Sequence, residues 1–391
     1  RYLMRFSTNL VPLRLEPGFY LRQGLALSEQ SHRRYKEDAG TVMEKEIVSG
    51  MLGKQSLQFM NKPYIIGSGS IVGSKEAAGP MGQLFDKAGY DDKFGAETWE
   101  DAESSLQKEA LEIALGKAGI KKQDLQLVYA GDLLGQSIAS SFGLSGYQVP
   151  HVGLYGACST CGLSLTMGSM AIAGEFAQKV ACITSSHFAS AEKEFRFPLA
   201  YGNQRPKSAT WTVTGSGAFV LSAQPGRQVR AVISGATVGK IVDYGLKDSM
   251  NMGACMAPAA ADTIKQHLED FGRKPDYYDK IITGDLGTVG QQLLFDLLSE
   301  AQIDITKQHM DCGIEIYDSE KQDTNAGGSG CGCSAVVLSA YILKKLEEGV
   351  WNRVLFMPTG ALLSKTSFNE GQSIPGIAHG VVLEHYDTVG A

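Results

Sequence analysis

Helical and strand-like hydrophobic patterns alternate along the chain from Met51 onward. Between residues 104 and 120, apolar residues recur every three or four positions, which predicts an amphipathic helix with one side toward a core. Residues 124–133 then form a short apolar run that contains Gly-Asp near its end, a pattern typical of a buried strand. A chain that alternates these two patterns is expected to fold as an α/β protein.

The same unit returns later in the chain, around a Gly-Asp-Leu triplet that follows a predicted strand at residues 131–133 and again at 284–286. A second repeat relates residues 157–186 to residues 331–360. Each copy begins with a turn of Cys, Ser and Gly, continues as a helix of small and apolar residues, and reaches a basic residue before a short strand. Two copies of one order of elements predict two halves that are related by a pseudo-twofold axis and share one core.

These repeats place the two halves at residues 51–225 and 226–391. Residues 1–50 have no sustained hydrophobic periodicity and carry scattered arginine and glutamate. The sequence at Met51 resembles a second start of the protein chain. We interpret residues 1–50 as an N-terminal extension with little order, whose status the sequence leaves open.

Composition narrows the classes of protein that fit. The chain has 391 residues, 43% of them hydrophobic, which is enough for a large core. Its net charge of -6, with both signs interleaved, argues against nucleic-acid binding. Seven cysteines, an odd number in a chain too long to need disulfide bonds, are expected to be free thiols. No apolar run approaches the roughly 18–20 residues that span a bilayer, and no signal peptide is recognisable, so any membrane association is expected to be peripheral.

Residues 153–174 set Cys158 and Cys161 at CxxC spacing, where a turn of small residues opens a helix. Three interpretations are open: a metal site, a redox pair, or a nucleophile at a strand-to-helix turn. A zinc site would need two more ligands, which Cys331 and Cys333 could supply across the pseudo-twofold axis, and we disfavour it. Cys161 falls one turn into the predicted helix and is expected to be a core residue. Cys158 would lie at the helix N-terminus, where N–H groups stabilise a thiolate or a bound carbonyl.

These motifs resemble those of the thiolase and ketoacyl-synthase superfamily. GACST at Gly156–Thr160 is similar to its nucleophile turn, and TVTGSGAFVLS at Thr212–Ser222 is similar to the glycine loop and strand that close its first half. TNAGGSGCGCSA at Thr324–Ala335 is similar to its Asn-Gly loop. The resemblance covers the chain after Met51 and implies a thiolase-like duplicated α-β-α-β-α fold with two halves related by a pseudo-twofold axis.

The chain departs from the superfamily at the residues that activate the cysteine. Decarboxylating members carry a His-Gln-Ala-Asn motif after a second-half strand, and the matching stretch here is TGDLG, with Asp285 and no histidine. Asn325 matches the Asn-Gly loop, and His187 and His379 lie near predicted strand ends. We assign no catalytic residue: Cys158 has a nucleophile-like position, and we expect it to line a pocket rather than to react.

The insertion at residues 187–211 combines cations with aromatic side chains: Arg196, Arg205 and Lys207 lie among Phe195, Phe197, Tyr201 and Trp211. Such a composition suits a flat aromatic anion, which it can hold by stacking and by charge-assisted hydrogen bonds. A solvated loop with a few anchoring aromatic residues is an equally good interpretation of any one of these residues. We expect Arg196 or Lys207 to contact a ligand carboxylate.

Further motifs are similar to those of a family of sporulation proteins within this superfamily, among them GPMGQLFD, AGDLLGQS, SSHFASAEKEFRFP, MAPAAADTIKQH and SIPGIAHGVV. This resemblance implies a non-enzymatic binding protein for dipicolinic acid (pyridine-2,6-dicarboxylate), peripheral to the spore inner membrane. There it would work with the membrane proteins of the stage V sporulation A operon in the uptake of dipicolinate and calcium during sporulation and their release in germination. It implies no cofactor other than calcium that accompanies dipicolinate, and it allows a homodimer. The alternative is an acyl-transferring or condensing enzyme with Cys158 as its nucleophile.

The expected ligand-binding residues lie at predicted strand ends, in loops or in the insertion; they are Cys158, His187, Arg196, Lys207, Asp132, Asp285, Asn325 and His379. Asp132 and Asp285 close the equivalent strand in each half, which gives the expected cavity a polar floor that is not strongly cationic. A dianion bound there would need cations from the insertion or a bridging calcium ion. We expect no metal at the cysteines.

Overall fold

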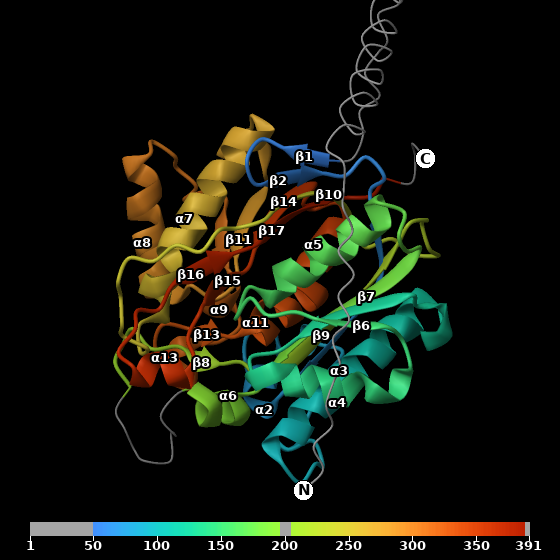
Figure 1. Ribbon diagram of the computed structural model, residues 1–391, viewed down its shortest axis with the longest axis horizontal. Helices are drawn as coiled ribbons and strands as arrows, with labels where there is room; N and C mark the ends of the chain where they lie inside the picture. Colours follow the sequence, from blue (N-terminus) through green and yellow to red (C-terminus); the bar gives the residue numbers. More distant parts are fainter. Residues whose placement is uncertain (1–49, 196–204, 388–391) are drawn as a thin grey trace, which may run out of the picture. The chain divides into compact units, whose positions relative to one another are not determined.

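The computed structural model describes residues 50–195 and 205–387 of the chain (Figure 1). Contacts divide the chain into Arg1–Ile47 and Val48–Ala391, and all described residues belong to the second unit. The expected extension at residues 1–50 lies outside the described residues, except for Gly50. Within the described residues, no helix combines the length and the apolar character needed to cross a membrane.

A long mixed sheet runs through the described residues in the strand order β12-β11-β14-β17-β10-β3-β9-β7-β5-β6. The strands of the first half are β3 (Tyr64–Val72), β5 (Leu127–Gly131), β6 (His151–Gly153), β7 (Lys179–Ser186) and β9 (Gly215–Ser222). Those of the second half are β10 (Ala231–Thr237), β11 (Lys280–Thr283), β12 (His309–Asp311), β14 (Arg353–Met357) and β17 (Gly380–Glu384).

The pairing of the strands shows the duplication that the sequence predicts. In the first half, β3–β9 and β9–β7 are antiparallel, and β7–β5 and β5–β6 are parallel. In the second half, β10–β17 and β17–β14 are antiparallel, and β14–β11 and β11–β12 are parallel. The two series meet where β10 pairs with β3. The expected duplicated α/β architecture is therefore confirmed.

Two helices rich in small residues are buried between the halves (Figure 1). α5 (Thr160–Ala173) contacts β7 and β5, and α11 (Cys331–Val337) contacts β9 and β7. The two helices contact each other, and every residue of α11 is buried, as expected from the repeat. Small residues are required here, because a Cβ added at Gly217 of β9 would lie 2.7 Å from Ala335 of α11.

The outer helices cover the two halves separately. α3 (Trp99–Ala118) packs on β3, β9 and β7 and on α4 (Ile138–Leu144), whereas α7 (Met252–Phe271) packs on α8 (Gly287–Glu300). The predicted helix at residues 104–120 lies almost wholly within α3, which Gly119 ends in the left-handed conformation.

Shorter elements complete the fold. The remaining strands pair as β1 (Gly50–Leu52) with β2 (Ser56–Gln58), β4 (Lys87–Ala88) with β3, β8 (Trp211–Thr212) with β13 (Gly328–Ser329), and β15 (Thr359–Ala361) with β16 (Gly376–Ala378). The remaining α-helices are α2 (Ser74–Ala77), α6 (Phe188–Phe195), α9 (Cys312–Glu315), α10 (Ser319–Gln322), α12 (Leu343–Glu347) and α13 (Lys365–Asn369). A π-helical turn, η7 (Leu338–Ile342), joins α11 to α12.

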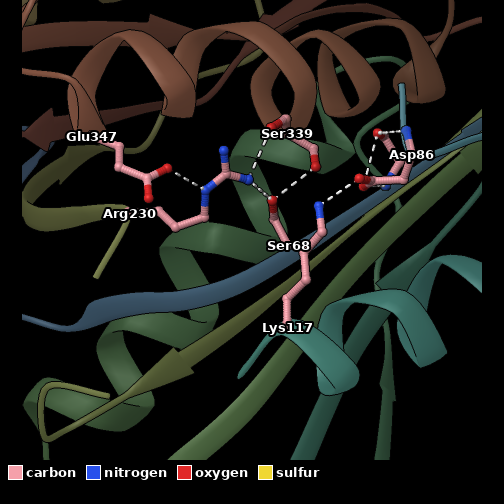
Figure 2. A network of polar contacts seen from close by, with 7 residues as sticks. Ser68, Asp86, Lys117, Arg230, Ser339 and Glu347 are labelled. Carbon is pink, nitrogen blue, oxygen red and sulfur yellow. Dashed lines mark hydrogen bonds and ion pairs between the residues drawn. The ribbon is translucent and has the colours of Figure 1, made fainter. Parts of the chain in front are cut away.

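A polar network ties the second half to β3 of the first half (Figure 2). Arg230, just before β10, donates from Nη1 to Ser68 Oγ (2.5 Å) and to the carbonyl oxygen of Ser339 (3.1 Å). Its Nε donates to Glu347 Oε2 (3.2 Å). The hydroxyl oxygens of Ser68 and Ser339 lie 2.8 Å apart, so β3 and η7 are also joined directly.

The same view shows how α3 is fastened to β3 (Figure 2). Lys117, near the end of α3, pairs with Asp86 at 2.5 Å. The Asp86 carboxylate in turn accepts a hydrogen bond from the Ser70 N–H of β3 (2.9 Å). β3 is thus the strand to which both a first-half helix and the second-half network are attached.

Replacing Arg230 with glutamine is expected to lower the free energy of unfolding by about 2 kcal/mol. The Arg230 side chain is only 12% exposed, and its loss leaves Glu347 without a cationic partner, with only the Gln228 amide as donor, and removes the charged donor to the Ser339 carbonyl. Urea unfolding measures the change. Arg227→Gln, which alters an exposed arginine three residues earlier, is the control and should change stability by less than about 0.5 kcal/mol. Equal effects of the two substitutions would contradict the role given to Arg230.

Candidate functional site

Cys158 lies in a tight turn that leads into α5. Ala157 has the uncommon φ of 48°, and Ser159 is the N-cap residue of α5. Ser159 Oγ donates to the Gly156 carbonyl oxygen (2.6 Å), and the Gly156 N–H donates to Thr160 Oγ1 (3.0 Å). A positive φ at a residue other than glycine is strained and persists only where such contacts hold it. Cys158 is therefore fixed at the helix N-terminus, where the sequence placed it.

A small cavity opens beside Cys158. Its volume is about 10 Å³, roughly the space of one water molecule. The lining residues come from both halves of the chain; they are Leu133, Tyr155, Ala157, Cys158, Thr212, Met252, Ser329, Ala361 and Leu363. The cavity is thus closed in this structure, and a ligand with an aromatic ring needs its walls to move apart.

Asp285 is buried next to the Cys158 thiol; it belongs to the stretch TGDLG, which the sequence analysis matched to the histidine motif of the superfamily. Its carboxylate accepts hydrogen bonds from Thr359 Oγ1 (2.8 Å), the Gly330 N–H (2.9 Å) and Ser329 Oγ (3.2 Å). Burial raises the pKa of Asp285, and hydrogen bonds, including one from the Cys158 thiol, oppose that rise. The carboxyl group that faces the thiol is therefore already surrounded by donors.

His187 and His379 are buried and do not line this cavity. The His187 Nε2 lies 2.6 Å from the carbonyl oxygen of Asp92, and its Nδ1 accepts from the Ala189 N–H (3.1 Å). His379 Nδ1 accepts from the Gly239 N–H (3.2 Å). Burial lowers the pKa of both rings, that of His379 to about 4. Both imidazoles hold backbone in place, and the structure does not bring them to the thiol as bases.

Asp132, the counterpart of Asp285 in the first half, is equally buried. It accepts hydrogen bonds from the Ser140 hydroxyl (2.6 Å), the Ser140 N–H (2.8 Å) and the Leu134 N–H (2.9 Å). All of these donors belong to its own half, and the next residue, Leu133, is the one that lines the cavity. The pseudo-twofold repeat thus gives two buried carboxyl groups, of which Asp285 reaches Cys158.

The other expected residues lie away from the cavity or outside the described residues. Asn325 is half-buried in the loop before β13, with a φ of 54°, and is not part of the lining. Lys207 is exposed. Arg196 lies outside the described residues.

Sequence reasoning missed Thr212 and Ser329, which face the cavity from the short β8–β13 pair. Both lie within motifs that the sequence singled out: Thr212 begins the glycine loop, and Ser329 follows Asn325 by four residues. The two motifs therefore indicated this part of the site. The strand pairing that brings Thr212 opposite Ser329 is set by the tertiary structure and could not be predicted from them.

The cysteines are all free thiols, as expected. In residues 50–195 and 205–387, no three Cys, His, Asp or Glu side chains are placed to hold a metal ion, so the four-cysteine zinc alternative is unsupported. Cys161 is fully buried in the main core, and burial raises its pKa to about 12. The two cysteines of the CxxC motif thus have different surroundings: Cys158 lines the cavity, and Cys161 belongs to the core.

The fold and the cysteine turn define a thiolase-like protein. Solved structures with this fold include human mitochondrial 3-ketoacyl-CoA thiolase in complex with CoA, with a TM-score of 0.53 and 12% identity over 84% of this chain and 99% of that one. Acetyl-CoA acetyltransferase from Syntrophomonas wolfei has a TM-score of 0.52 and 9% identity, covering 86% of this chain and 100% of that one. At such identities the likeness shows the fold alone.

The chain belongs to the Stage V sporulation protein AD family, whose family model matches residues 53–384. A relative, Stage V sporulation protein AD of Bacillus subtilis (strain 168), is 45% identical over 335 residues, which cover 85% of this chain and 98% of that protein. The chain is therefore a sporulation protein with a thiolase-like fold.

Glu76 in α2 is a further buried acid, which the sequence analysis did not consider. Its Oε1 accepts from the Thr214 N–H (3.0 Å) and from the Tyr317 hydroxyl, whereas its Oε2 has no partner among the described residues. Burial raises the pKa of Glu76 from 4.5 to about 7. Ionisation of Glu76 therefore costs free energy in the folded state.

We expect Glu76→Gln to stabilise the protein at pH 8 but not at pH 5. Because the folded pKa lies above the unfolded one, stability falls as the pH rises from about 4.5 through about 7, and glutamine removes this loss of up to about 3 kcal/mol. Urea unfolding at both pH values measures the difference. Glu320→Gln, at an exposed glutamate, is the control. The same change at pH 5 and pH 8 would contradict the prediction.

Proposed function

We propose that the chain is a non-enzymatic binding protein for dipicolinic acid and that the Cys158 cavity is where the ligand is received. Membership in a sporulation family supports the setting, since the resemblance implies this ligand. The observation that carries the proposal is that the Cys158 thiol meets the buried carboxyl group of Asp285, in the stretch where the resemblance leads us to expect a histidine.

The chemistry of acyl transfer explains why this replacement matters. A thiol nucleophile needs a group that takes its proton and donors that stabilise the oxyanion. Here the thiol donates to a buried carboxyl group that Thr359, Ser329 and Gly330 also hold. A carboxyl group with these partners holds the thiol in place from behind the cavity wall, and we propose that the cavity itself serves binding.

The lining suits a planar aromatic ligand once the walls separate. Leu133, Met252 and Leu363 offer apolar surface to a ring, and Thr212 and Ser329 offer hydroxyl groups to a carboxylate or a ring nitrogen. The present volume of about 10 Å³ means that binding is coupled to an opening of the cavity.

The negative charge of the ligand opposes its binding in this cavity. No lysine or arginine is in the lining, and the buried Asp285 lies behind it, next to the Cys158 thiol. Both Asp132 and Asp285 are already hydrogen-bonded, so a calcium ion that bridged them to the ligand would have to displace these donors. We therefore propose that calcium, where it takes part, comes with the ligand, and that cations outside the lining offset the rest of the charge.

Isothermal titration with dipicolinate, with calcium and with a chelator, tests this proposal. Wild-type protein should bind, and Thr212→Val should bind about three- to ten-fold more weakly because one hydroxyl is lost from the lining. Thr366→Val, at an exposed threonine, is the matched control. Absence of binding to wild-type protein under both conditions would defeat the proposal.

Labelling separates binding from the alternative of an acyl-transferring enzyme. After incubation with radiolabelled acetyl-coenzyme A, wild-type protein and Cys158→Ala should both remain unlabelled. Label on wild-type protein that Cys158→Ala abolishes would show that the thiol forms an acyl-enzyme and would overturn the non-enzymatic part of the proposal.

We further propose that the protein works at the spore inner membrane as a peripheral subunit, with the membrane proteins of the stage V sporulation A operon as partners. The family resemblance implies this arrangement. In fractionated spores the chain should sediment with the inner membrane and be released when those membrane proteins are deleted. Unchanged sedimentation after their deletion would contradict the proposed partners.

A further inference from the structure

Two cations converge on one indole ring outside the cavity. Lys75 Nζ lies 4.3 Å from the centroid of the Trp211 ring, and the Arg205 guanidinium carbon lies 5.2 Å from it. Phe188 stacks on the same indole, with centroids 5.7 Å apart. Residues from two distant parts of the sequence thus form one cationic and aromatic cluster.

Two consecutive residues at the end of α10 hold the cations in place. Lys75 Nζ donates to the carbonyl oxygen of Gln322 (2.6 Å). Arg205 Nη2 donates to the carbonyl oxygen of Asp323 (2.6 Å) and to its Oδ2 (2.7 Å). Because neighbouring carbonyl groups anchor them, the ammonium and guanidinium groups are kept near each other.

The cluster lacks negative charge for two cations. Asp323 is the partner of Arg205, but its side chain is 83% exposed, so water screens the pair. Glu76, next to Lys75, is the other acid that acts on it, and the pKa of Glu76 is raised to about 7 by burial. Burial is the main cause that lowers the pKa of Lys75, and the positive charge of the nearby Arg205 lowers it further.

A donor in the cluster is also left without an acceptor. Arg205 Nη1 is buried and has no hydrogen-bond partner among the described residues. A buried N–H group of a charged side chain without an acceptor costs free energy, and such groups call for an explanation. An anion at Nη1 would supply both the missing acceptor and the missing charge.

The cluster lies next to the Cys158 cavity through the β8–β13 pair. Trp211 pairs with Gly328, and Thr212 pairs with Ser329. Successive residues of a strand face opposite sides, so Thr212 faces the cavity while Trp211 faces the cations. Two consecutive residues of β8 therefore belong one to the cationic cluster and the other to the cavity lining.

We propose that Lys75 and Arg205 form a carboxylate-binding subsite at the outer side of β8, which holds a carboxylate of the aromatic dicarboxylate before the ligand enters the Cys158 cavity. A guanidinium fork beside an ammonium group matches a carboxylate in charge and shape. The subsite supplies the positive charge that the cavity lining lacks. This inference rests on the proposed function for the identity of the ligand.

Isothermal titration with dipicolinate tests the subsite directly. Arg205→Gln and Lys75→Gln should each weaken binding about ten- to hundred-fold, because each removes a charge-assisted contact. Arg205→Lys, which keeps the charge but not the fork, should lie between Arg205→Gln and wild type. Lys274→Gln, an equal change of charge at an exposed lysine of the second half, is the matched control and should bind within about two-fold of wild type.

Tryptophan emission gives a second readout, because Trp211 contacts both cations. The chain has three tryptophans, and Trp211→Phe identifies the signal of this one. Emission that responds to dipicolinate in wild type but not in Arg205→Gln, while near-ultraviolet circular dichroism shows Arg205→Gln to be folded, would support the subsite.

The outcomes separate this inference from the proposed function. Equal affinity of wild type and both glutamine variants would overturn the subsite and leave dipicolinate binding intact. If wild-type protein does not bind dipicolinate, the proposed function fails, and benzoate then becomes the probe of the subsite. A Trp211 emission change with benzoate that Arg205→Gln abolishes would support a carboxylate subsite, and no change would overturn it.

Discussion

The burial of α5 and α11 against each other is the constraint on which the rest of the structure depends. α11 has no exposed residue and packs against β9 and β7, so its sequence is restricted to small and apolar side chains. The close approach of Gly217 to Ala335 shows how little room remains. Because both helices begin near the pseudo-twofold axis, their first turns bring Cys158 and Cys331 together in one small cluster.

This arrangement makes the centre of the protein polar as well as tightly packed. Small residues such as serine, threonine and glycine leave hydroxyl and N–H groups that need partners, and buried carboxyl groups accept from them. Asp285 and Asp132 are the clearest examples, one in each half. Where the superfamily motif has an imidazole that can exchange a proton, this chain has a carboxyl group fixed by hydrogen bonds. The proposed binding function depends on this difference.

The distribution of charge separates two regions of the site. The cavity beside Cys158 has no cation in its lining and has the buried Asp285 behind its cysteine, whereas Lys75 and Arg205 lie on the other side of a short strand. Water is excluded more completely from the cavity than from the cluster, since Asp323 remains largely exposed. The cations of the cluster can balance the charge of an anion, whereas the cavity lining offers none, so the cluster is the better place for an anion to bind.

The sequence by itself determined the repeat, because hydrophobic period and the order of motifs are local properties that a duplication copies. The basic residues Lys179 and Arg353 begin equivalent strands, and the turn at Cys158 precedes a buried helix. Tertiary structure alone decided how polar side chains are used. His187 and His379 lie near predicted strand ends in the sequence, but only the structure shows that a backbone group distant in the chain occupies one ring nitrogen of each. Lys75 meets Gln322 across 247 positions, and no local pattern encodes such a contact. Hydrogen bonds and ion pairs depend on distances of a few ångströms, and only the packing of the two halves sets those distances.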